Sequence, residues 1–161
     1  MATTEENKGT IAAFYASFAA GDGDAMAAHY APDATFKDPA FGTLTGAEAG
    51  DMWRMLTGRA SDLAIELPEH DADGDTGTAH WIARYTFAQT GRFVVNDIHA
   101  TFRFAPDGRI AEHVDAFSFH KWSRQALGTP GLLLGWTPIL PAMTQKKARA
   151  QLAAFRTSRG S

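Results

Sequence analysis

The stretch AEHVDAFSFH, residues 111–120, combines the alternation of a β-strand with two side chains that can transfer protons. His113 and Asp115 lie two positions apart, so they share one face of a strand, and Phe117 and Phe119 follow on the same face. A strand that only covers a core alternates apolar and polar residues between its two faces. An imidazole and a carboxyl group beside two aromatic rings instead predict the wall of a cavity.

Asp115 is the main catalytic candidate in the sequence. A carboxyl group in an apolar cavity is a usable general base or acid, and His113 is close enough to be its partner in proton transfer. Asp38, which precedes Pro39, is a second carboxyl candidate. Each has a structural alternative, because a strand-end aspartate or a histidine often binds only a neighbouring group, and an aspartate before proline often only forms a turn.

Three tyrosines, Tyr15, Tyr30 and Tyr85, are candidate hydroxyl donors, and we place Tyr15 first. Aromatic residues at this spacing equally suit an apolar wall. The H-x-D triplet at 113–115 also matches part of a two-histidine, one-carboxylate iron site. Such a site needs a second histidine from a distant strand, and His120 has the opposite parity on the same strand. We therefore expect no metal ligands and no bound cofactor.

Composition narrows the class of protein. The chain has 161 residues, of which 45% are hydrophobic, and this suffices for one domain with a core. The net charge of -3 gives no basic field for nucleic acid, and the absence of cysteine excludes disulfides, thiolate metal sites and cysteine nucleophiles. The start is polar and acidic, and the longest apolar stretch, residues 131–140, is too short to span a membrane. We expect a cytoplasmic protein without a membrane span.

Helix signals dominate the first 60 residues. The motif TTEE at 3–6 is typical of a helix start, and apolar residues recur at helical spacing over 11–18. A short second helix is predicted over about 24–30, and a strand in ATFKDP ends at Pro39. The capping-box pattern TGAE at 45–48 opens a third helix.

Strand signals dominate the middle of the chain, where four alternating runs separated by glycine-containing turns predict an antiparallel meander. These runs lie near residues 62–71, 78–88, 93–104 and 109–119. After them we expect a helix from about Lys121, a loop at 128–141 and a helix over about 142–157. The architecture is therefore α+β, with helices over the concave side of a curved sheet that encloses a pocket.

The segments FYASFAAGDGDAMAAHYAPDATFKDP and DGRIAEHVDAF resemble the SnoaL-like and ketosteroid-isomerase-like branch of the nuclear transport factor 2 superfamily. The resemblance covers about residues 8–120 and implies a cone-shaped fold, in which N-terminal helices and a curved antiparallel sheet surround a pocket. Residues 121–161 are then a helical extension of a single domain that spans 1–161. Proteins of this superfamily include isomerases, cyclases, dehydratases, epoxide hydrolases and non-catalytic binders, so the fold alone does not give the function.

The resemblance also places functional residues. The general-base aspartate of the steroid isomerase falls on Asp38, but its oxyanion-binding tyrosine falls on Phe14, next to Tyr15, and its neutral carboxylic acid falls on Ala100. Both oxyanion donors are therefore missing. The essential last-strand aspartate of SnoaL-type cyclases and of limonene epoxide hydrolase falls on Asp115. The segment AHWIARYTF lacks the Arg and Asp, two positions apart, that the hydrolase also needs, so hydrolysis of epoxides is the less favoured activity.

Three hypotheses follow. The first is a cofactor-free enzyme that moves protons on an apolar small molecule, in a cyclisation, isomerisation, dehydration or hydrolysis. The second is a non-catalytic protein that binds an apolar ligand, and the third is a dimeric interaction module with a filled pocket. The expected catalytic residues are Asp115, His113, Asp38 and Tyr15. The expected pocket residues are Phe14, Phe18, Tyr30, Trp53, Trp81, Tyr85, Ala100, Phe102 and Phe117.

Two further surfaces are marked in the sequence. Polar residues at 97, 99, 101 and 103 alternate with 96, 98, 100 and 102, which predicts a polar outer sheet face, and in this superfamily that face often supports a homodimer. The basic residues of the last 16 positions are interpreted as the solvated side of a terminal helix. The segment TPGLLLGWTPILP, residues 129–141, can close the pocket, pack outside the sheet or join a dimer interface.

Overall fold

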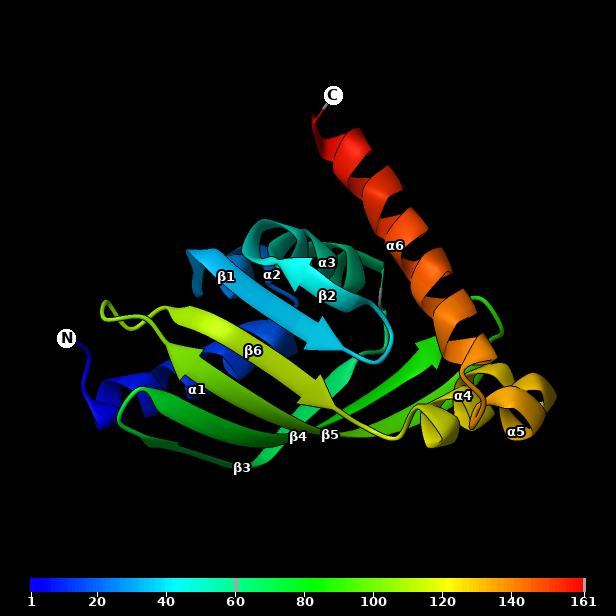
Figure 1. Ribbon diagram of the computed structural model, residues 1–161, viewed down its shortest axis with the longest axis horizontal. Coiled ribbons are helices and arrows are strands. Elements are labelled where there is room, and N and C mark those ends of the chain that lie inside the picture. Colours follow the sequence, from blue (N-terminus) through cyan, green and yellow to red (C-terminus); the bar gives the residue numbers. More distant parts are fainter. Residues whose placement is uncertain (60, 161) are drawn as a thin grey trace.

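The computed structural model describes residues 1–59 and 61–160 (Figure 1). The chain begins with α1 (Thr4–Ala19), α2 (Gly23–Ala28), β1 (Tyr30–Asp38), β2 (Gly42–Thr45) and α3 (Gly46–Arg59). Four strands follow, β3 (Ala64–Asp73), β4 (Thr76–Phe87), β5 (Arg92–Phe104) and β6 (Ile110–Ala116). The described chain ends with α4 (Phe119–Leu127), α5 (Thr129–Leu134) and α6 (Ile139–Gly160).

Local capping signals place the first helices where the sequence predicts them. Thr3 is the N-cap of α1, and its Oγ1 accepts a hydrogen bond from the backbone N–H of Glu6 at 3.1 Å. At α3 the capping box forms in both directions: the Thr45 N–H donates to Glu48 Oε1 at 2.9 Å, and the Glu48 N–H donates to Thr45 Oγ1 at 3.2 Å. These bonds satisfy N–H groups that a helix start leaves without a helical partner.

The second helix is shorter than the sequence predicts. Helix α2 ends at Ala28, and Tyr30, which we expected in that helix, is the first residue of β1. Pro32 accounts for the difference, because a residue that precedes proline avoids the helical conformation and Ala31 is therefore extended. The side chain of Tyr30 is consequently buried under the sheet rather than carried on a helix.

The six strands form one curved sheet in the order β2-β1-β6-β5-β4-β3. The predicted meander of β3 to β6 is antiparallel throughout, and Gly74 and Gly108 take the positive φ angles of 60° and 87° that its turns require. The expectation of a purely antiparallel sheet was wrong, because β1 runs parallel to β6. The sheet does not close into a barrel, since β2 and β3 remain as its two edges.

The last strand also ends earlier than predicted. Strand β6 stops at Ala116, because Ser118 caps α4 by accepting the backbone N–H of Lys121 at 3.2 Å. Phe119, which we expected on the strand face, is therefore the first residue of α4.

The C-terminal region contains more helix than the sequence predicts. Residues 128–141, expected as a loop, include α5. This helix packs so closely on α4 that a β-carbon at Gly131 would overlap the carbonyl group of Ser123. Glycine is therefore required at this contact. Because glycine has a low helix propensity, the sequence pattern did not predict a helix here.

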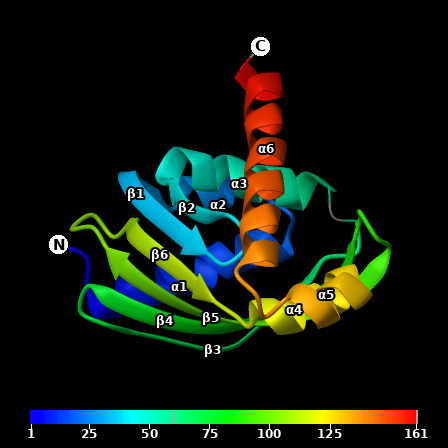
Figure 2. The same cartoon turned by 45° about the vertical axis from the view of Figure 1, so that its right-hand side comes forward.

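Helix α6 projects past the sheet edge at β2 and beside α3 (Figures 1 and 2). Arg149 Nη2 donates a hydrogen bond to the Thr43 carbonyl at 2.9 Å, and Arg156 Nε donates to Asp51 Oδ2 at 3.0 Å. Among the residues that the structure describes, no helix is long and apolar enough to cross a membrane.

The main core lies between the concave face of the sheet and helices α1 and α3. It is rich in aromatic rings, which stack edge to face around Phe14 and Trp53. A smaller cluster of Val94, Trp122 and Ala126 joins α4 to β5. The two clusters hold the sheet in a curve whose concave side stays partly open.

Candidate functional site

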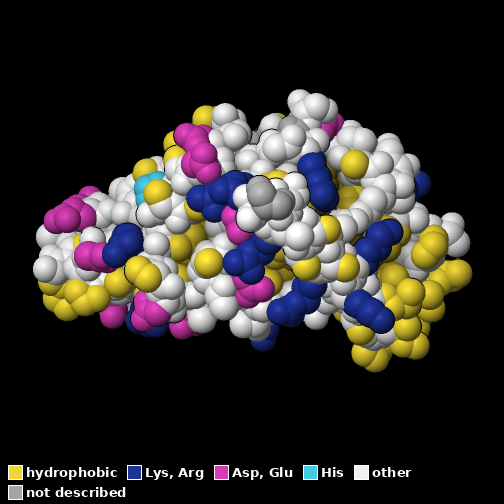
Figure 3. All heavy atoms as spheres, turned by 90° about the horizontal axis from the view of Figure 1, so that it is seen from above, with side chains coloured by type: hydrophobic (Ala, Val, Ile, Leu, Met, Phe, Trp, Pro, Cys, Tyr) yellow, Lys and Arg dark blue, Asp and Glu magenta, His cyan; other side chains and the backbone are white. Residues whose placement is uncertain are grey.

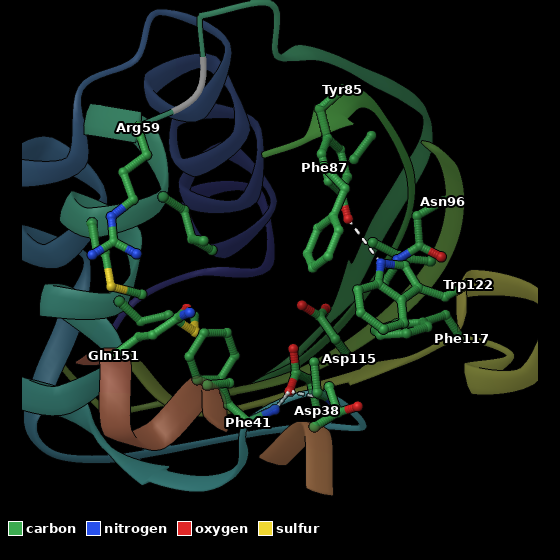
Figure 4. Close-up of a pocket in the computed structure, with 18 of the residues that line it drawn as sticks. Asp38, Phe41, Arg59, Tyr85, Phe87, Asn96, Asp115, Phe117, Trp122 and Gln151 are labelled. Atoms are coloured by element: carbon green, nitrogen blue, oxygen red, sulfur yellow. Dashed lines mark hydrogen bonds between the residues drawn. The ribbon is translucent and has the colours of Figure 1, made fainter. Parts of the chain in front are cut away.

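The concave face of the sheet, α3 and the C-terminal helices enclose a cavity of about 400 Å³ (Figure 4). A cavity of this size can take a small organic molecule. Most of its wall is apolar, with aromatic rings from β4, from helices α1, α3 and α4, and from residues that follow β1 and β6. These rings belong to Phe18, Phe41, Trp53, Trp81, Tyr85, Phe87, Phe117 and Trp122.

Asp38, the last residue of β1, presents its carboxyl group to the cavity. Its Oδ1 accepts the backbone N–H groups of Ala40 at 2.9 Å and Phe41 at 2.6 Å, in the turn that Pro39 favours. Burial raises the pKa of Asp38 to about 7; the bond from Phe41 opposes this change, and the nearby Asp115 carboxyl adds to it. Near neutral pH this carboxyl group therefore exists in both protonation states.

Asp115 approaches the same cavity from β6 and is only 4% exposed. Its Oδ1 accepts a hydrogen bond from Trp81 Nε1 at 3.3 Å and lies 2.9 Å from His113 Nε2. In Figure 4 the carboxyl groups of Asp38 and Asp115 both point into the cavity and lie next to each other. Two carboxyl groups thus meet inside an otherwise apolar wall.

The parallel pairing of β1 with β6 brings the two carboxyl groups together. Phe36 pairs with His113 and Lys37 with Val114, so the next positions along the two strands are 38 and 115. Residues at equivalent positions of neighbouring strands point to the same face of a sheet. The two aspartates are 77 positions apart in the sequence, and only this strand pairing makes them neighbours.

A buried hydrogen-bonded chain supports Asp115 from behind. Trp53 Nε1 donates to the Tyr30 hydroxyl oxygen at 2.9 Å, and that hydroxyl lies 2.8 Å from His113 Nδ1. Because Tyr30 has one proton to give, it donates to Nδ1, which leaves the proton of a neutral His113 on Nε2, directed at Asp115. His113 is fully buried, so it orients the carboxyl group without facing the cavity itself.

Tyr85 gives the cavity a hydroxyl group. Trp122 Nε1 donates to the Tyr85 hydroxyl oxygen at 2.8 Å, and this bond is visible in Figure 4. Since the oxygen accepts from Trp122, the hydroxyl proton remains available to a ligand. Burial raises the pKa of Tyr85, which keeps the group protonated and therefore a donor.

The structure sorts the predicted site residues into two layers. The wall contains Asp38 and Asp115 together with five predicted pocket residues, namely Phe18, Trp53, Trp81, Tyr85 and Phe117. The second layer is buried behind the wall and contains His113 and Tyr15 with the other predicted pocket residues, namely Phe14, Tyr30, Ala100 and Phe102.

Tyr15 differs most from its expected position. Its ring packs on Trp81, with 5.4 Å between ring centres, and lies outside the cavity wall. Burial raises the pKa of Tyr15 well above its usual range, and its hydroxyl has no hydrogen-bond partner among the residues that the structure describes. Of the three tyrosines, Tyr85 is the one whose side chain lines the cavity.

Sequence reasoning missed several polar wall residues. Asn96 is 8% exposed and points to the same inner face of β5 as Ile98. The alternation of residues along β5 therefore could have predicted its inward position. No strand pattern could have predicted Trp122 in the wall, because this residue belongs to α4. The wall also contains Arg59, Gln151 and Lys147, which come from the ends and faces of α3 and α6.

Metal-ligand spacing occurs on the opposite face of the sheet. Among the described residues, the ligand atoms of His80, Asp97 and His99 lie within 4.8 Å of one another. His80 Nε2 is 2.7 Å from Asp97 Oδ1, and the two histidine rings stack at 4.6 Å. His80 and Asp97 are thus hydrogen-bonded, His99 stacks on His80, and this surface cluster is not part of the cavity.

Comparison with known proteins identifies the fold. The sequence profile of the SnoaL-like domain matches residues 11–113, which is more than half of the chain. No functionally curated protein matches the chain.

Three solved structures illustrate the likeness. A hypothetical protein from Catenulispora acidiphila DSM 44928, with a ketosteroid isomerase-like fold and in complex with trimethylamine, has 21% identity, a TM-score of 0.65, and coverage of 80% of this chain and 97% of its own. A SnoaL-like protein of unknown function from Burkholderia thailandensis E264 has 23% identity, a TM-score of 0.58, and coverage of 71% and 96%. An LEH-like epoxide hydrolase from M. tuberculosis has 20% identity, a TM-score of 0.64, and coverage of 81% and 94%.

Proposed function

Because the chain belongs to the SnoaL-like domain family, whose fold often carries isomerases, cyclases or hydrolases, we propose that it catalyses proton transfer on an apolar small molecule without a cofactor. One observation carries this proposal: Asp38 and Asp115 share an otherwise apolar cavity, and the pKa of Asp38 is raised to about 7. A carboxyl group that keeps its proton to about pH 7 can act as an acid, and the second carboxyl group beside it can act as a base.

The environments of the two groups suggest their roles. Asp38 keeps its proton below about pH 7 and can donate it, so it is the general acid. Asp115 has Oδ1 held by Trp81 and His113, and it accepts the substrate proton as the general base. The two oxyanion donors that the resemblance places at positions 14 and 100 are absent, and a protonated Asp38 replaces them as the donor to a developing oxyanion.

The simplest reaction of this kind moves a double bond next to a carbonyl group. Asp115 removes the α-proton of a β,γ-unsaturated ketone while Asp38 donates its hydrogen bond to the carbonyl oxygen. The resulting dienolate, whose oxygen accepts the hydrogen bond from Asp38, takes the same proton back from Asp115 at the γ-carbon, so no atom is gained or lost and the product is the conjugated ketone. Tyr85 offers a further hydroxyl donor for orienting the substrate. Cyclisation of a related carbonyl compound uses the same two proton transfers.

Isomerisation of cyclohex-3-enone to cyclohex-2-enone tests the proposal, because conjugation creates an ultraviolet absorption band. We expect kcat/KM to fall about tenfold per pH unit above about pH 7, as Asp38 loses its proton. Asp38→Asn should remove this falling limb. A rate that instead rises through pH 7 contradicts the assignment of Asp38 as the acid.

A second candidate function is binding of a small cationic amine. The aromatic rings of Trp53 and Trp81 and the two carboxyl groups form the kind of wall that attracts alkylammonium ions, and the Catenulispora protein holds trimethylamine. Calorimetry with tetramethylammonium, whose charge does not change with pH, tests this function. We expect affinity to increase roughly tenfold as pH rises through about 7, because the ionised Asp38 attracts the cation. Affinity independent of pH would contradict this candidate.

We retain two further expectations as part of the proposal, a homodimer and a cytoplasmic location. The outer face of β5 supports the first, because polar residues at 97, 99, 101 and 103 are exposed along it. Epoxide hydrolysis, the activity in the name of the M. tuberculosis protein, is not proposed, because the Arg and Asp pair remains absent from the segment at 79–87.

A further inference from the structure

The segment between α5 and the first turns of α6 exposes an unusual amount of apolar surface. Six large hydrophobic side chains within residues 132–143 are between 43% and 73% exposed. In the rest of the described chain only Met1 and Phe93 are large hydrophobic residues with such exposure. The six residues, which we name the α5–α6 patch, are Leu132, Leu133, Leu134, Trp136, Ile139 and Met143.

The charge around the α5–α6 patch has one sign. Residues 116–161 contain seven Lys or Arg and no Asp or Glu, so this part carries +7 while residues 1–115 carry -10. Lys121 and Arg124 on α4 and Lys146 and Lys147 on α6 are exposed. In Figure 3 the hydrophobic patch lies at the end of the molecule where α5 lies in Figure 1, with Lys and Arg side chains beside it.

We propose that the α5–α6 patch docks on the surface of an anionic lipid bilayer. Segments that lie in a membrane interface combine exposed aliphatic residues with basic neighbours. Tryptophan is enriched at the level of the lipid headgroups. Trp136 is the most exposed residue of the patch, at 73%. Because no described helix can span a membrane, the attachment is peripheral and reversible.

The patch continues into the mouth of the cavity. Met143 is 63% exposed and also belongs to the cavity wall, next to Leu140 and Lys147 of the same helix. A bilayer that receives the patch therefore lies against the opening. An apolar substrate can then pass from the lipid phase into the cavity; this link rests on the proposed function, whereas the docking itself does not.

A second copy of the chain fits the patch less well. A symmetric dimer joins the same surface of both copies, so Lys121, Arg124, Lys146 and Lys147 of one copy would meet the same four residues of the other. The segment 116–161 contains no acidic residue to balance them. An anionic headgroup layer neutralises these charges and receives the apolar side chains at the same time.

Co-sedimentation of the full chain with vesicles tests the docking without any substrate. We expect strong binding to vesicles of phosphatidylcholine and phosphatidylglycerol at a 3:1 ratio, about tenfold or more weaker binding to phosphatidylcholine alone, and loss of binding in high salt. Because turnover is not measured, the result is independent of the proposed reaction.

Two double variants test separately the apolar and the electrostatic contribution to vesicle binding. Leu133→Ser/Trp136→Ser removes exposed apolar surface, so the fold is retained, and should weaken vesicle binding at least about tenfold. Lys121→Gln/Arg124→Gln should weaken it roughly 25-fold, about fivefold for each charge. The matched control, Lys8→Gln/Arg103→Gln, removes two exposed charges from α1 and β5 and should leave binding within about threefold of wild type.

Several outcomes overturn the proposal. Absence of binding to the anionic vesicles does so, and so does binding that Leu133→Ser/Trp136→Ser leaves unchanged. Sedimentation equilibrium tests the alternative that a second copy of the chain binds the patch. If the wild type is a dimer that does not bind vesicles, and the double variant is a monomer, the patch is a dimer interface. If the vesicle results are as expected but the enone is not converted, the docking stands and only the proposed reaction fails.

Discussion

Under the proposed function, Asp115→Asn is expected to lower kcat/KM for cyclohex-3-enone isomerisation by roughly 10²–10⁴-fold, because asparagine cannot accept the proton that a general base removes. The substitution is mild in structural terms. Asparagine keeps the Oδ1 acceptor for Trp81 Nε1 and His113 Nε2, so the buried chain behind the wall persists. The measurement is the initial rate of ultraviolet absorbance change at pH 6, with circular dichroism to show that the variant is folded.

Asp97→Asn is the matched control for this loss. It makes the same chemical change on the outer sheet face, where Asp97 contacts His80, and it should leave the rate within about threefold of wild type. Unchanged turnover in Asp115→Asn would remove Asp115 from the mechanism. If the wild type and both variants are equally inactive while tetramethylammonium binds, the binding function is the better description.

Asp38→Asn is expected to stabilise the protein at alkaline pH. The unfolded chain releases this proton near pH 3.8, whereas the folded protein holds it to about pH 7. Stability therefore falls as pH rises from about 4 to about 7, because the unfolded state binds fewer protons over that window. Raising the pKa from 3.8 to about 7 corresponds to about 4 kcal/mol, which is the upper limit of the loss in the wild type. Asparagine does not ionise and avoids that loss.

Urea unfolding of the wild type and Asp38→Asn at pH 4.5 and pH 8.5 measures the effect. The difference in free energy of unfolding between the two proteins should shift in favour of the variant by up to about 4 kcal/mol at the higher pH. Asp33→Asn, at an exposed position of the same strand, serves as the control and should show no such shift. A constant difference at both pH values would mean that Asp38 is already ionised in the folded protein at pH 4.5.

Local signals in the sequence proved reliable where a few neighbouring residues decide the structure. The capping box at Thr45 and Glu48, the turn glycines and the antiparallel meander depend on contacts between residues close in the chain. The parallel pairing of β1 with β6 depends on residues about 80 positions apart, and alternation within a strand does not specify its partner. The short helix α5 escaped prediction because its glycine is needed for packing against α4, a contact that local propensity does not include.

The same distinction applies to the site. Asp115 and Asp38 could be named from strand parity and from resemblance, but their common cavity follows from the β1–β6 register. Sequence analysis ranked Tyr15 above Tyr85 as a hydroxyl donor. The position of a residue on a helix face does not reveal whether another side chain will cover its ring, and in the structure Trp81 packs against Tyr15. Asn96 was recoverable, since it shares the inward parity of Ile98, whereas Trp122 depends on how α4 docks.

The mouth of the cavity and its two carboxyl groups come from different parts of the chain. The carboxyl groups come from strands that end by residue 116, whereas Leu140 and Met143 come from α6. Substitutions in α6 can therefore alter which molecules fit the cavity mouth while the two carboxyl groups stay in place. The shape of the cavity mouth and the position of the carboxyl pair are thus encoded in separate stretches of the sequence.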